Sequence, residues 1–253
     1  MKLSPKELTA MKSNEQIAML TAYNCPIARY IEKVGVPVIL VGDTLAMVEM
    51  GHDSTRPITI ENMEYHVGAV RRGAPDTHLI GDLPYLTYEE KGDALRNSIR
   101  LLEAGADSVK LEGGKIEIIS HLCENGIDVV GHTGLTPQTA SNFRRVGGSR
   151  EEYLRILEEA KQITKAGAFM LVLEHIPEAL GKEITDSISI PTIGIGAGSD
   201  CDGQVLVTND ALGIGDSWPP FSKQYAYLGE VIVDALSTFK EEVESKSQIA
   251  KQS

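Results

Sequence analysis

Short apolar runs alternate along this chain with longer amphipathic segments. The runs span Ile17–Asn24, Val36–Gly42, Thr77–Gly81, Ser108–Leu111, Ile127–Gly131, Phe169–Leu173, Pro191–Ile195 and Gln204–Val207. Runs of about 4–8 residues that are rich in Val, Ile and Leu are typical of strands buried on both faces, as in a parallel sheet. The pattern therefore predicts a series of buried parallel strands.

The amphipathic segments between these runs predict helices. The clearest are Ile27–Lys33, Glu89–Ala104, Lys115–Glu124 and Arg150–Ala166, and they are followed by Gly35, Gly105, Gly126 and Gly167. A glycine just beyond a helix end favours the left-handed backbone that stops a helix. About eight strand–helix units in a chain of this length predict one (β/α)8 TIM barrel of the α/β class. An open doubly wound sheet is the alternative, because periodicity does not show closure.

The domain prediction is a single barrel domain over residues 1–253, with a C-terminal helical extension at about 221–247. The last residues, from Lys240 to Ser253, are polar and charged. Chain ends of this composition tend to fray.

Ionisable residues follow successive apolar runs where the strands are predicted to end. They are Asp43, Asp82, Lys110, Glu112, His132 and Glu174. The C-terminal ends of the strands form the active-site face of a TIM barrel, so we expect these side chains to meet at one mouth. Each acid could instead cap the next helix. No helix signal follows Asp82 or Glu174 directly, which favours the first interpretation.

Four carboxylates at one mouth would repel one another. Two unit charges ~5 Å apart at an effective dielectric of ~20 repel by roughly 3 kcal/mol. Lys110 offsets one charge, and the others need a cation or raised pKa values. Oxygen ligands without cysteine favour a hard divalent cation, Mg²⁺ first and Mn²⁺ second. The other five histidines, His52, His66, His78, His121 and His175, lack zinc-site spacing and are interpreted as surface or core residues.

Two glycine-containing segments bear on the site. Gly194–Gly198 could cradle an anion or make a tight turn, and the absence of a following basic residue favours the turn. The segment 131–138 resembles a pocket wall. The fingerprints of serine hydrolases, P-loop nucleotidases and Rossmann dehydrogenases are missing from the sequence.

Composition narrows the setting. The formal net charge of −12 over 253 residues disfavours binding to nucleic acid or to anionic membranes. The three cysteines, Cys25, Cys123 and Cys201, are an odd number without metal-site spacing, which favours free thiols in a reducing compartment. No signal peptide and no membrane-spanning run is evident, so we expect a cytoplasmic protein.

The candidate residues together suggest a reaction class. Two carboxylates on a hard cation leave positions for the carboxylate and ketone oxygens of a small 2-oxo acid. A further carboxylate could remove the proton beside the ketone, and Lys110 or His132 could stabilise the negative charge that develops. The residues alone predict metal-dependent enolate chemistry.

An ordered set of motifs resembles one family. The motifs are V-G-D-T at 41–44, G-H-D-S-T at 51–55, R-R-G-A-P at 71–75, G-D-L-P at 81–84, V-K-L-E-G-G at 109–114, G-H-T-G-L-T-P-Q at 131–138, L-V-L-E at 171–174, I-G-I-G-A-G at 193–198 and D-G-Q-V-L-V at 202–207. In this order, from about residue 3 to about residue 240, they resemble ketopantoate hydroxymethyltransferase (3-methyl-2-oxobutanoate hydroxymethyltransferase).

The resemblance implies a (β/α)8 barrel enzyme of pantothenate and coenzyme A biosynthesis. It would transfer a hydroxymethyl group from the co-substrate 5,10-methylenetetrahydrofolate to 3-methyl-2-oxobutanoate, giving 2-dehydropantoate, with one Mg²⁺ per subunit. It also implies a homo-oligomer, typically a decamer of two stacked pentamers.

Site roles follow from the same resemblance. Asp43 and Asp82 match the Mg²⁺ ligands, and Glu112 matches a carboxylate that interacts with metal-bound water. Substrate contacts are implied for Tyr23, Thr44, Lys110 and His132, with the family often having Ser in place of Thr44. Glu174 matches the proposed general base, which we expect to be buried and without a cationic neighbour in the sequence other than His175.

Two alternatives differ in class. One is a C–C lyase of the same phosphoenolpyruvate/pyruvate-using superfamily, although the cysteine-containing loop signature of such lyases is missing. The other is a non-catalytic barrel that binds a metabolite or folate. The presence of Asp43, Asp82 and Glu174 disfavours it, because a binder would tolerate their loss.

Overall fold

The computed structural model describes residues 2–245, and the chain divides into two compact units at Leu206 and Val207. The first unit contains a closed barrel of parallel strands in the order β1 to β8. The strands are β1 (Ile17–Thr21), β2 (Val38–Val41), β3 (His78–Asp82), β4 (Ser108–Lys110), β5 (Val129–Gly134), β6 (Met170–Glu174), β7 (Thr192–Ile195) and β8 (Gly203–Leu206). Closure through the β1–β8 pair confirms the predicted (β/α)8 barrel and excludes the open sheet.

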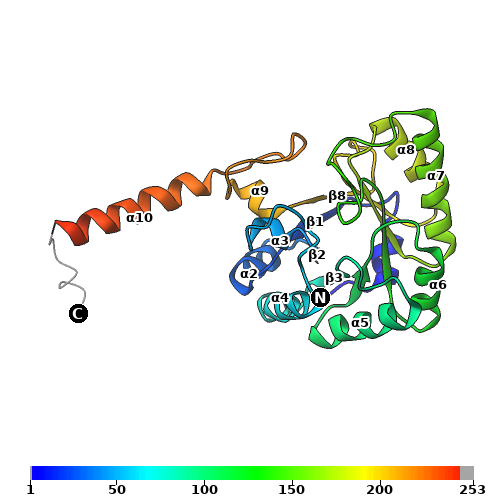
Figure 1. The fold of residues 1–253 in the computed structure, drawn as a ribbon, viewed down its shortest axis with the longest axis horizontal. Coiled ribbons are helices and arrows are strands. Elements are labelled where there is room, and N and C mark those ends of the chain that lie inside the picture. The colour runs from blue at the N-terminus through cyan, green and yellow to red at the C-terminus, as the bar shows by residue number, and fades with distance from the viewer. Residues whose placement is uncertain (1, 246–253) are drawn as a thin grey trace. The chain divides into compact units, whose positions relative to one another are not determined.

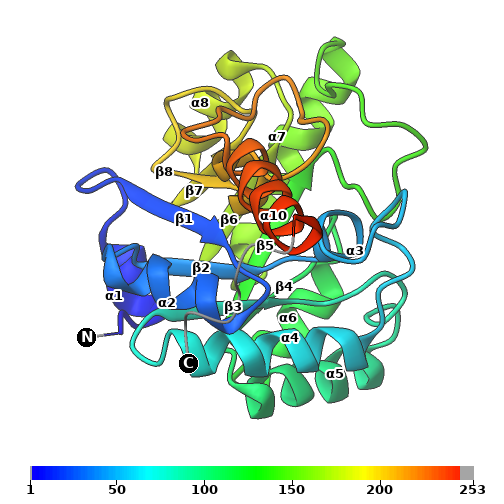
Figure 2. The ribbon, with the colours of Figure 1, turned by 90° about the vertical axis from the view of Figure 1, so that its left-hand side faces the viewer.

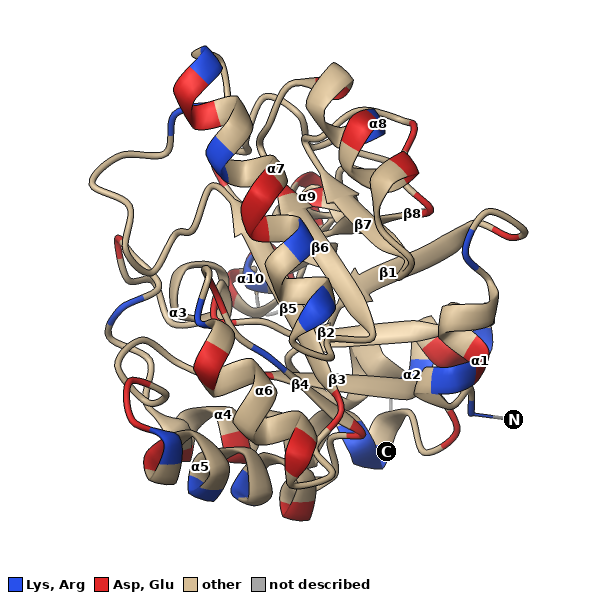
Figure 3. Cartoon of the chain, turned by 90° about the vertical axis from the view of Figure 1, so that its right-hand side faces the viewer, with Lys and Arg blue, Asp and Glu red and all other residues tan. Residues whose placement is uncertain are grey.

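Helices surround the strands of this unit (Figures 1 and 2). They are α1 (Pro5–Ala10), α2 (Cys25–Lys33), α3 (Leu45–Val48), α4 (Ile60–Gly73), α5 (Lys91–Ala104), α6 (Ile116–Glu124), α7 (Arg150–Lys165) and α8 (Glu178–Ser187). Charged residues of both signs lie mainly on the helices, whereas the strands carry few (Figure 3). The helices thus form the charged exterior of a sheet that is apolar on both faces.

Alternation along the strands divides the core into an inner and an outer part. Val38 and Leu40 belong to the inner cluster, which also takes in Leu8 of α1, whereas Ile39 and Val41 pack in the outer cluster with the helices. Successive side chains of a strand point to opposite faces, so this period of two is expected. The barrel interior is therefore filled with apolar side chains up to the level where polar ones begin.

Several strand boundaries differ from the predicted ranges for local reasons. β1 ends at Thr21 rather than Asn24, because the Asn24 side chain accepts a hydrogen bond from Ile27 N (3.0 Å) and caps α2. β5 extends to Gly134, so His132 lies within the strand rather than after it. The glycines predicted to stop helices have positive φ, for example 120° at Gly105.

The second compact unit contains α9 (Thr208–Leu212) and α10 (Leu228–Glu244). The predicted extension at about 221–247 is therefore helical only from Leu228, and residues 246 and 247 lie outside the described part. None of the residues of α10 is buried within the single chain. Across residues 2–245, no helix is long and apolar enough to cross a membrane.

Candidate active site at the C-terminal ends of the strands

The predicted polar residues do meet at the C-terminal ends of the strands. Strand register explains this, because Asp82 of β3 pairs with Lys110 of β4. Asp82 and His132 follow Ile80 and Val130 by two residues, and these apolar residues belong to the inner cluster. The alternation of a strand therefore turns the polar side chains toward the barrel interior as well.

Asp82 forms a buried ion pair with Lys110. Lys110 Nζ lies 2.8 and 2.7 Å from the two carboxylate oxygens of Asp82, and Asp43 N donates to Asp82 Oδ2 at 3.2 Å. Burial opposes the charge on Lys110, but Asp82, Glu112 and Asp43 outweigh it and raise the pKa of the ammonium group. Lys110 is therefore a fixed positive charge at the mouth.

The Asp43 carboxyl group is buried, and within residues 2–245 no cationic side chain is in hydrogen-bond contact with it. Its Oδ2 accepts a hydrogen bond from Gln138 Nε2 at 2.9 Å. Burial and the charges of Asp82 and Glu112 raise the pKa of Asp43 well above its usual range. The Asp43 side chain does not cap α3, whose N-cap is Thr44. The helix-cap alternative is thus wrong for Asp43.

His132 lies between two carboxylates. Its Nδ1 is 3.4 Å from Glu112 Oε1, its Nε2 is 3.3 Å from Glu174 Oε2, and neither contact has hydrogen-bond geometry. Burial opposes the imidazolium form, but the two carboxylates outweigh it and raise the pKa of His132 to about 9. His132 is therefore a buried cation near neutral pH whose ring nitrogens keep hydrogen-bonding capacity.

His132 is the direct cationic contact of both Glu112 and Glu174. Burial alone would raise the pKa of Glu112, but His132 and, at longer range, Lys110 lower it. Glu174 was expected to be buried, and in the sequence it has no cationic neighbour other than His175. Its side chain is 18% exposed and contacts His132.

Gln138 contacts both Asp43 and Glu112, although no role was predicted for it from the sequence. The side chain is fully buried. Its Nε2 also donates to Leu83 O at 3.0 Å, its Oε1 accepts from Tyr88 Oη at 2.5 Å, and its backbone N donates to Glu112 Oε2 at 3.1 Å. The sequence feature that could have pointed to Gln138 is its place as the last residue of the 131–138 motif. Tyr88 had no signal in the sequence.

Tyr23 and Thr44 lie beside Asp43, as their predicted role requires. The Tyr23 side chain is 2% exposed, with Thr21 and Thr44 next to its phenol, and burial raises its pKa. In contrast, Gly194–Gly198 shows the features of a tight turn. A Cβ at Gly198, where φ is +88°, would lie 2.4 Å from Glu178 Cγ.

The donor set fits a hard divalent cation held by two carboxylates. Asp43 and Asp82 offer only oxygen, and burial together with the neighbouring carboxylates raises the pKa of Asp43, so a bound cation would favour its ionised form. Mg²⁺ is usually bound by one or two carboxylates, water and substrate oxygens. Among residues 2–245, however, no group of three or more His, Cys, Asp or Glu side chains is arranged to hold a metal. Glu112, the third predicted metal residue, instead faces His132 and Gln138 N.

Comparison with known proteins decides the family. The family model described as ketopantoate hydroxymethyltransferase matches residues 2–248. The chain belongs to the ketopantoate hydroxymethyltransferase family. The family and the hydroxymethyltransferase activity expected from the ordered motifs are thereby confirmed.

Individual relatives of this family agree over nearly the whole length. The chain is 48% identical over 250 residues to 3-methyl-2-oxobutanoate hydroxymethyltransferase of Thermotoga maritima, covering 95% of this chain and 92% of that protein. It is 47% identical over 242 residues to the protein of the same name from Caldivirga maquilingensis, covering 93% and 91%.

Solved structures show the fold at greater distance. Phosphonopyruvate hydrolase has a TM-score of 0.65 at 12% identity, covering 100% of this chain and 90% of that one. For 2,3-dimethylmalate lyase the TM-score is 0.63 at 14% identity, with coverage of 100% and 93%. At these identities the likeness concerns the barrel fold alone.

Proposed function

We propose that this hydroxymethyltransferase moves a one-carbon unit from 5,10-methylenetetrahydrofolate to 3-methyl-2-oxobutanoate, giving 2-dehydropantoate for pantothenate and coenzyme A synthesis. Family membership supports the activity. The observation that carries the site is the buried cluster in which His132 contacts both Glu112 and Glu174, beside the Asp82–Lys110 pair.

Asp43 and Asp82 are the residues that would hold a divalent cation, one per subunit and Mg²⁺ by preference. Such a cation supplies Lewis-acid polarisation of the 2-oxo group. Lys110 contacts both oxygens of Asp82 and would share that carboxylate with the cation. Glu112 is the third residue of the proposed metal site and would contact the cation through a water molecule rather than directly.

Glu174 acts in this proposal as the general base. Carbon 3 of the oxo acid carries one hydrogen, which the neighbouring ketone makes acidic. Among residues 2–245 the Glu174 carboxylate has one cationic contact, His132, and it remains partly exposed to the mouth. It takes the proton from carbon 3, the electron pair of the C–H bond forms a double bond to carbon 2, and the ketone oxygen becomes negative. Water adds to the one-carbon unit of the folate and both of its C–N bonds break, so the two nitrogens of tetrahydrofolate take the protons of the water and formaldehyde is left. Carbon 3 then bonds to the formaldehyde carbon as the carbon–carbon double bond to carbon 2 reverts to the ketone, and the new alkoxide takes the proton held by Glu174 to become the hydroxyl group.

The remaining residues bind the oxo acid and stabilise charge. Lys110 and His132 are fixed cations beside the developing oxyanion, where preorganised charges contribute most. Tyr23 and Thr44 bring hydroxyl groups to the same side as Asp43. These roles also separate the proposal from a C–C lyase, because the bond made here is between carbon 3 and the one-carbon unit.

Proton abstraction and transfer can be measured separately. Enzyme, Mg²⁺ and oxo acid in D₂O without folate should exchange the carbon-3 hydrogen, followed by NMR. Glu174→Gln should lose both exchange and transfer, by about 10²–10⁴-fold, while still binding oxo acid. Glu158→Gln, an exposed residue of α7, is the matched control. Exchange by Glu174→Gln at the wild-type rate would show that another group is the base, and His132 or a water held by Glu112 would be tested next.

The assembly is proposed to be a homo-oligomer, with a decamer as the expected form. In the single chain, α10 exposes apolar side chains along one face. Four of them, Ile232, Leu236, Phe239 and Val243, recur at helical spacing, as expected of a helix that packs against another surface. Light scattering should give about ten times the 27.4 kDa chain mass, and a monomer mass would contradict the proposal.

The expected place of action is the cytoplasm. All three cysteines are free, Cys25, Cys123 and Cys201, which is typical of a reducing compartment. Binding to nucleic acid or to membrane lipid is not expected, because the surface is acidic overall.

A further inference from the structure

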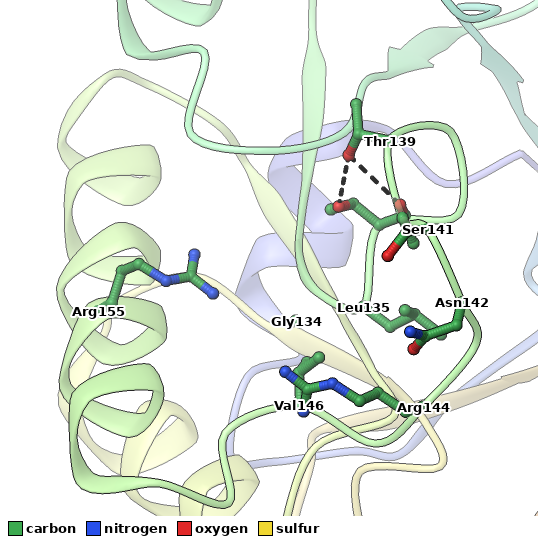
Figure 4. A pocket seen from close by; sticks show the side chains of 10 residues that line it. Gly134, Leu135, Thr139, Ser141, Asn142, Arg144, Val146 and Arg155 are labelled. Carbon is green, nitrogen blue, oxygen red and sulfur yellow. Dashed lines mark hydrogen bonds between the residues drawn. The ribbon is translucent and has the colours of Figure 1, made fainter.

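A pocket of about 310 Å³ lies where β5 ends and its loop begins. Its walls come from Gly134 and Leu135, from the loop that includes Ser141, Asn142 and Arg144, and from Arg155 of α7 (Figure 4). The mechanism above uses none of these residues. The volume is at the small end of ligand pockets, so the space would admit part of a cofactor-sized molecule.

The lining carries two cations and no carboxylate. Figure 4 shows Arg144 and Arg155 extending toward each other from opposite sides of the pocket. Their side chains are 59% and 57% exposed, and each contacts one glutamate that is not part of the lining, Glu152 and Glu159 respectively. A guanidinium group has five N–H donors, so both arginines keep donors for an anionic ligand.

The lining also carries two polar side chains that have no hydrogen-bond partner in the described part of the chain. The side chains of Ser141 and Asn142 make no hydrogen bond within the described residues 2–245. The apolar part of the lining consists of Val146, which is half-buried, and of the largely buried Leu135. The pocket therefore suits a ligand with an apolar part and carboxylates.

The position of the pocket indicates which ligand this is. Gly134 pairs in register with Glu174, and Leu135 N donates to Glu174 O at 2.8 Å. The pocket thus begins next to the proposed base. Because the one-carbon unit must reach the carbon that Glu174 deprotonates, its donor has to lie against this part of the barrel.

We infer that this pocket binds the glutamate end of the reduced folate, with the folate carboxylates contacting Arg144 and Arg155. This inference rests on the proposed function, since only that reaction brings a folate to the mouth. The aromatic portion of the folate packs on the apolar part of the lining, Val146 and Leu135, and Ser141 and Asn142 bind its amide groups.

The test uses Arg144→Gln, Arg155→Gln and the double variant in the intact enzyme. Each single change should raise KM for monoglutamyl 5,10-methylenetetrahydrofolate about 3- to 10-fold, the size expected for one charge-assisted contact at an exposed site. With triglutamyl folate, the ratio of the variant KM to the wild-type KM should be larger than with monoglutamyl folate. KM for the oxo acid and folate-free exchange in D₂O should remain unchanged. Arg96→Gln, an exposed arginine of α5 paired with Asp93, is the matched control.

A second probe avoids turnover. p-Aminobenzoyl-triglutamate should inhibit wild type by competing with folate, and the double variant should resist it. Unchanged folate KM and unchanged inhibition in the double variant would overturn the inference while leaving the proposed function standing. If wild type forms no product from any reduced folate, the proposed function itself fails. Arg155→Gln remains decisive if changes at Arg144 disturb the loop, because Arg155 has only a 3.5 Å contact within its own helix.

Discussion

The two ends of the barrel bury charged side chains in opposite ways. At the N-terminal ends of the strands, Asp202 accepts hydrogen bonds from Lys12 Nζ, Ser13 N and Thr192 N at 2.9, 3.0 and 2.9 Å. Asp107 at the same end accepts from Lys2, Arg71 and Leu79 N. Burial opposes ionisation at both positions, but these donors lower both pKa values.

At the C-terminal ends the balance is reversed. Asp43 has an amide donor and no cation of its own, and its pKa is raised. The pKa of Asp82 is also raised by burial, despite its contact with Lys110. The folded chain thus gives Asp202 a cation and backbone donors that stabilise its ionised form, whereas it leaves the ionised forms of Asp43 and Asp82 less stable than in water. The difference separates carboxylates that stabilise the barrel from carboxylates kept for a ligand, as perturbed groups in functional sites often are.

The largest expected effect is that of Asp43→Asn. Activity should fall at least about 100-fold, because a cation ligand is lost. The metal-free protein should become more stable by about 1–2 kcal/mol, because a buried charge without compensation is removed. Steady-state kinetics and urea unfolding in EDTA measure the two effects. Asp93→Asn on exposed α5 is the control, and a metal-free Asp43→Asn protein less stable than wild type would break the comparison.

Asp202→Asn should behave in the opposite manner. It should lower the free energy of unfolding by about 2–4 kcal/mol, because Lys12 and the backbone donors lose a charged acceptor. Below its melting temperature the variant should keep kcat/KM within about twofold of wild type. Loss of activity in a folded Asp202→Asn protein would show that the N-terminal end also serves catalysis.

Gln138→Met sharpens the comparison within the mouth. Both Nε2 donors disappear, so the Asp43 carboxylate loses the group that orients it. Mg²⁺ affinity measured by calorimetry should weaken about 10- to 100-fold, the usual range for groups that orient metal ligands. Gln162→Met on the exposed face of α7 is the control and should leave Mg²⁺ affinity unchanged. If Gln138→Met bound Mg²⁺ as tightly as Gln162→Met, Gln138 would not position the metal ligand.

The smallest effects should appear as opposite responses to pH. Asp202 has a lowered pKa, so its stabilisation is present above the unfolded value of about 3.9 and is lost as pH falls through the folded value. Asp43 has a raised pKa, so its destabilisation is full above that raised value, declines as pH falls through it and is gone below the unfolded value. Each slope stays below about 1.4 kcal/mol per pH unit. Urea unfolding in EDTA from pH 8 to pH 3 measures the difference in free energy of unfolding between wild type and each variant. As pH falls, the difference between wild type and Asp43→Asn should vanish before the difference between wild type and Asp202→Asn. If both differences vanished at the same pH, the assignment would be contradicted.

Much of the fold could be read from local patterns. The apolar runs located all eight strands to within a few residues, and the glycines after the helices adopt the expected positive φ. Helix α4 was not among the predicted helices, although Met63, Val67 and Val70 form its buried stripe. Its local context explains this, because Gly73 is followed by Ala74-Pro75 rather than by an apolar run.

The sequence by itself indicated that the strand-end residues from Asp43 to Glu174 reach the mouth, whereas the tertiary structure added Gln138 and Tyr88 and decided how all of them pair. Residues two apart along a strand are separated by about 6–7 Å, whereas neighbouring parallel strands lie about 4.8 Å apart. Lys110 therefore pairs across the sheet with Asp82 and not along its own strand with Glu112. Likewise, strand order brings His132 between Glu112 and Glu174, and the loop after β5 carries Gln138 back to Asp43. Such lateral contacts depend on register and closure, which local sequence patterns do not encode.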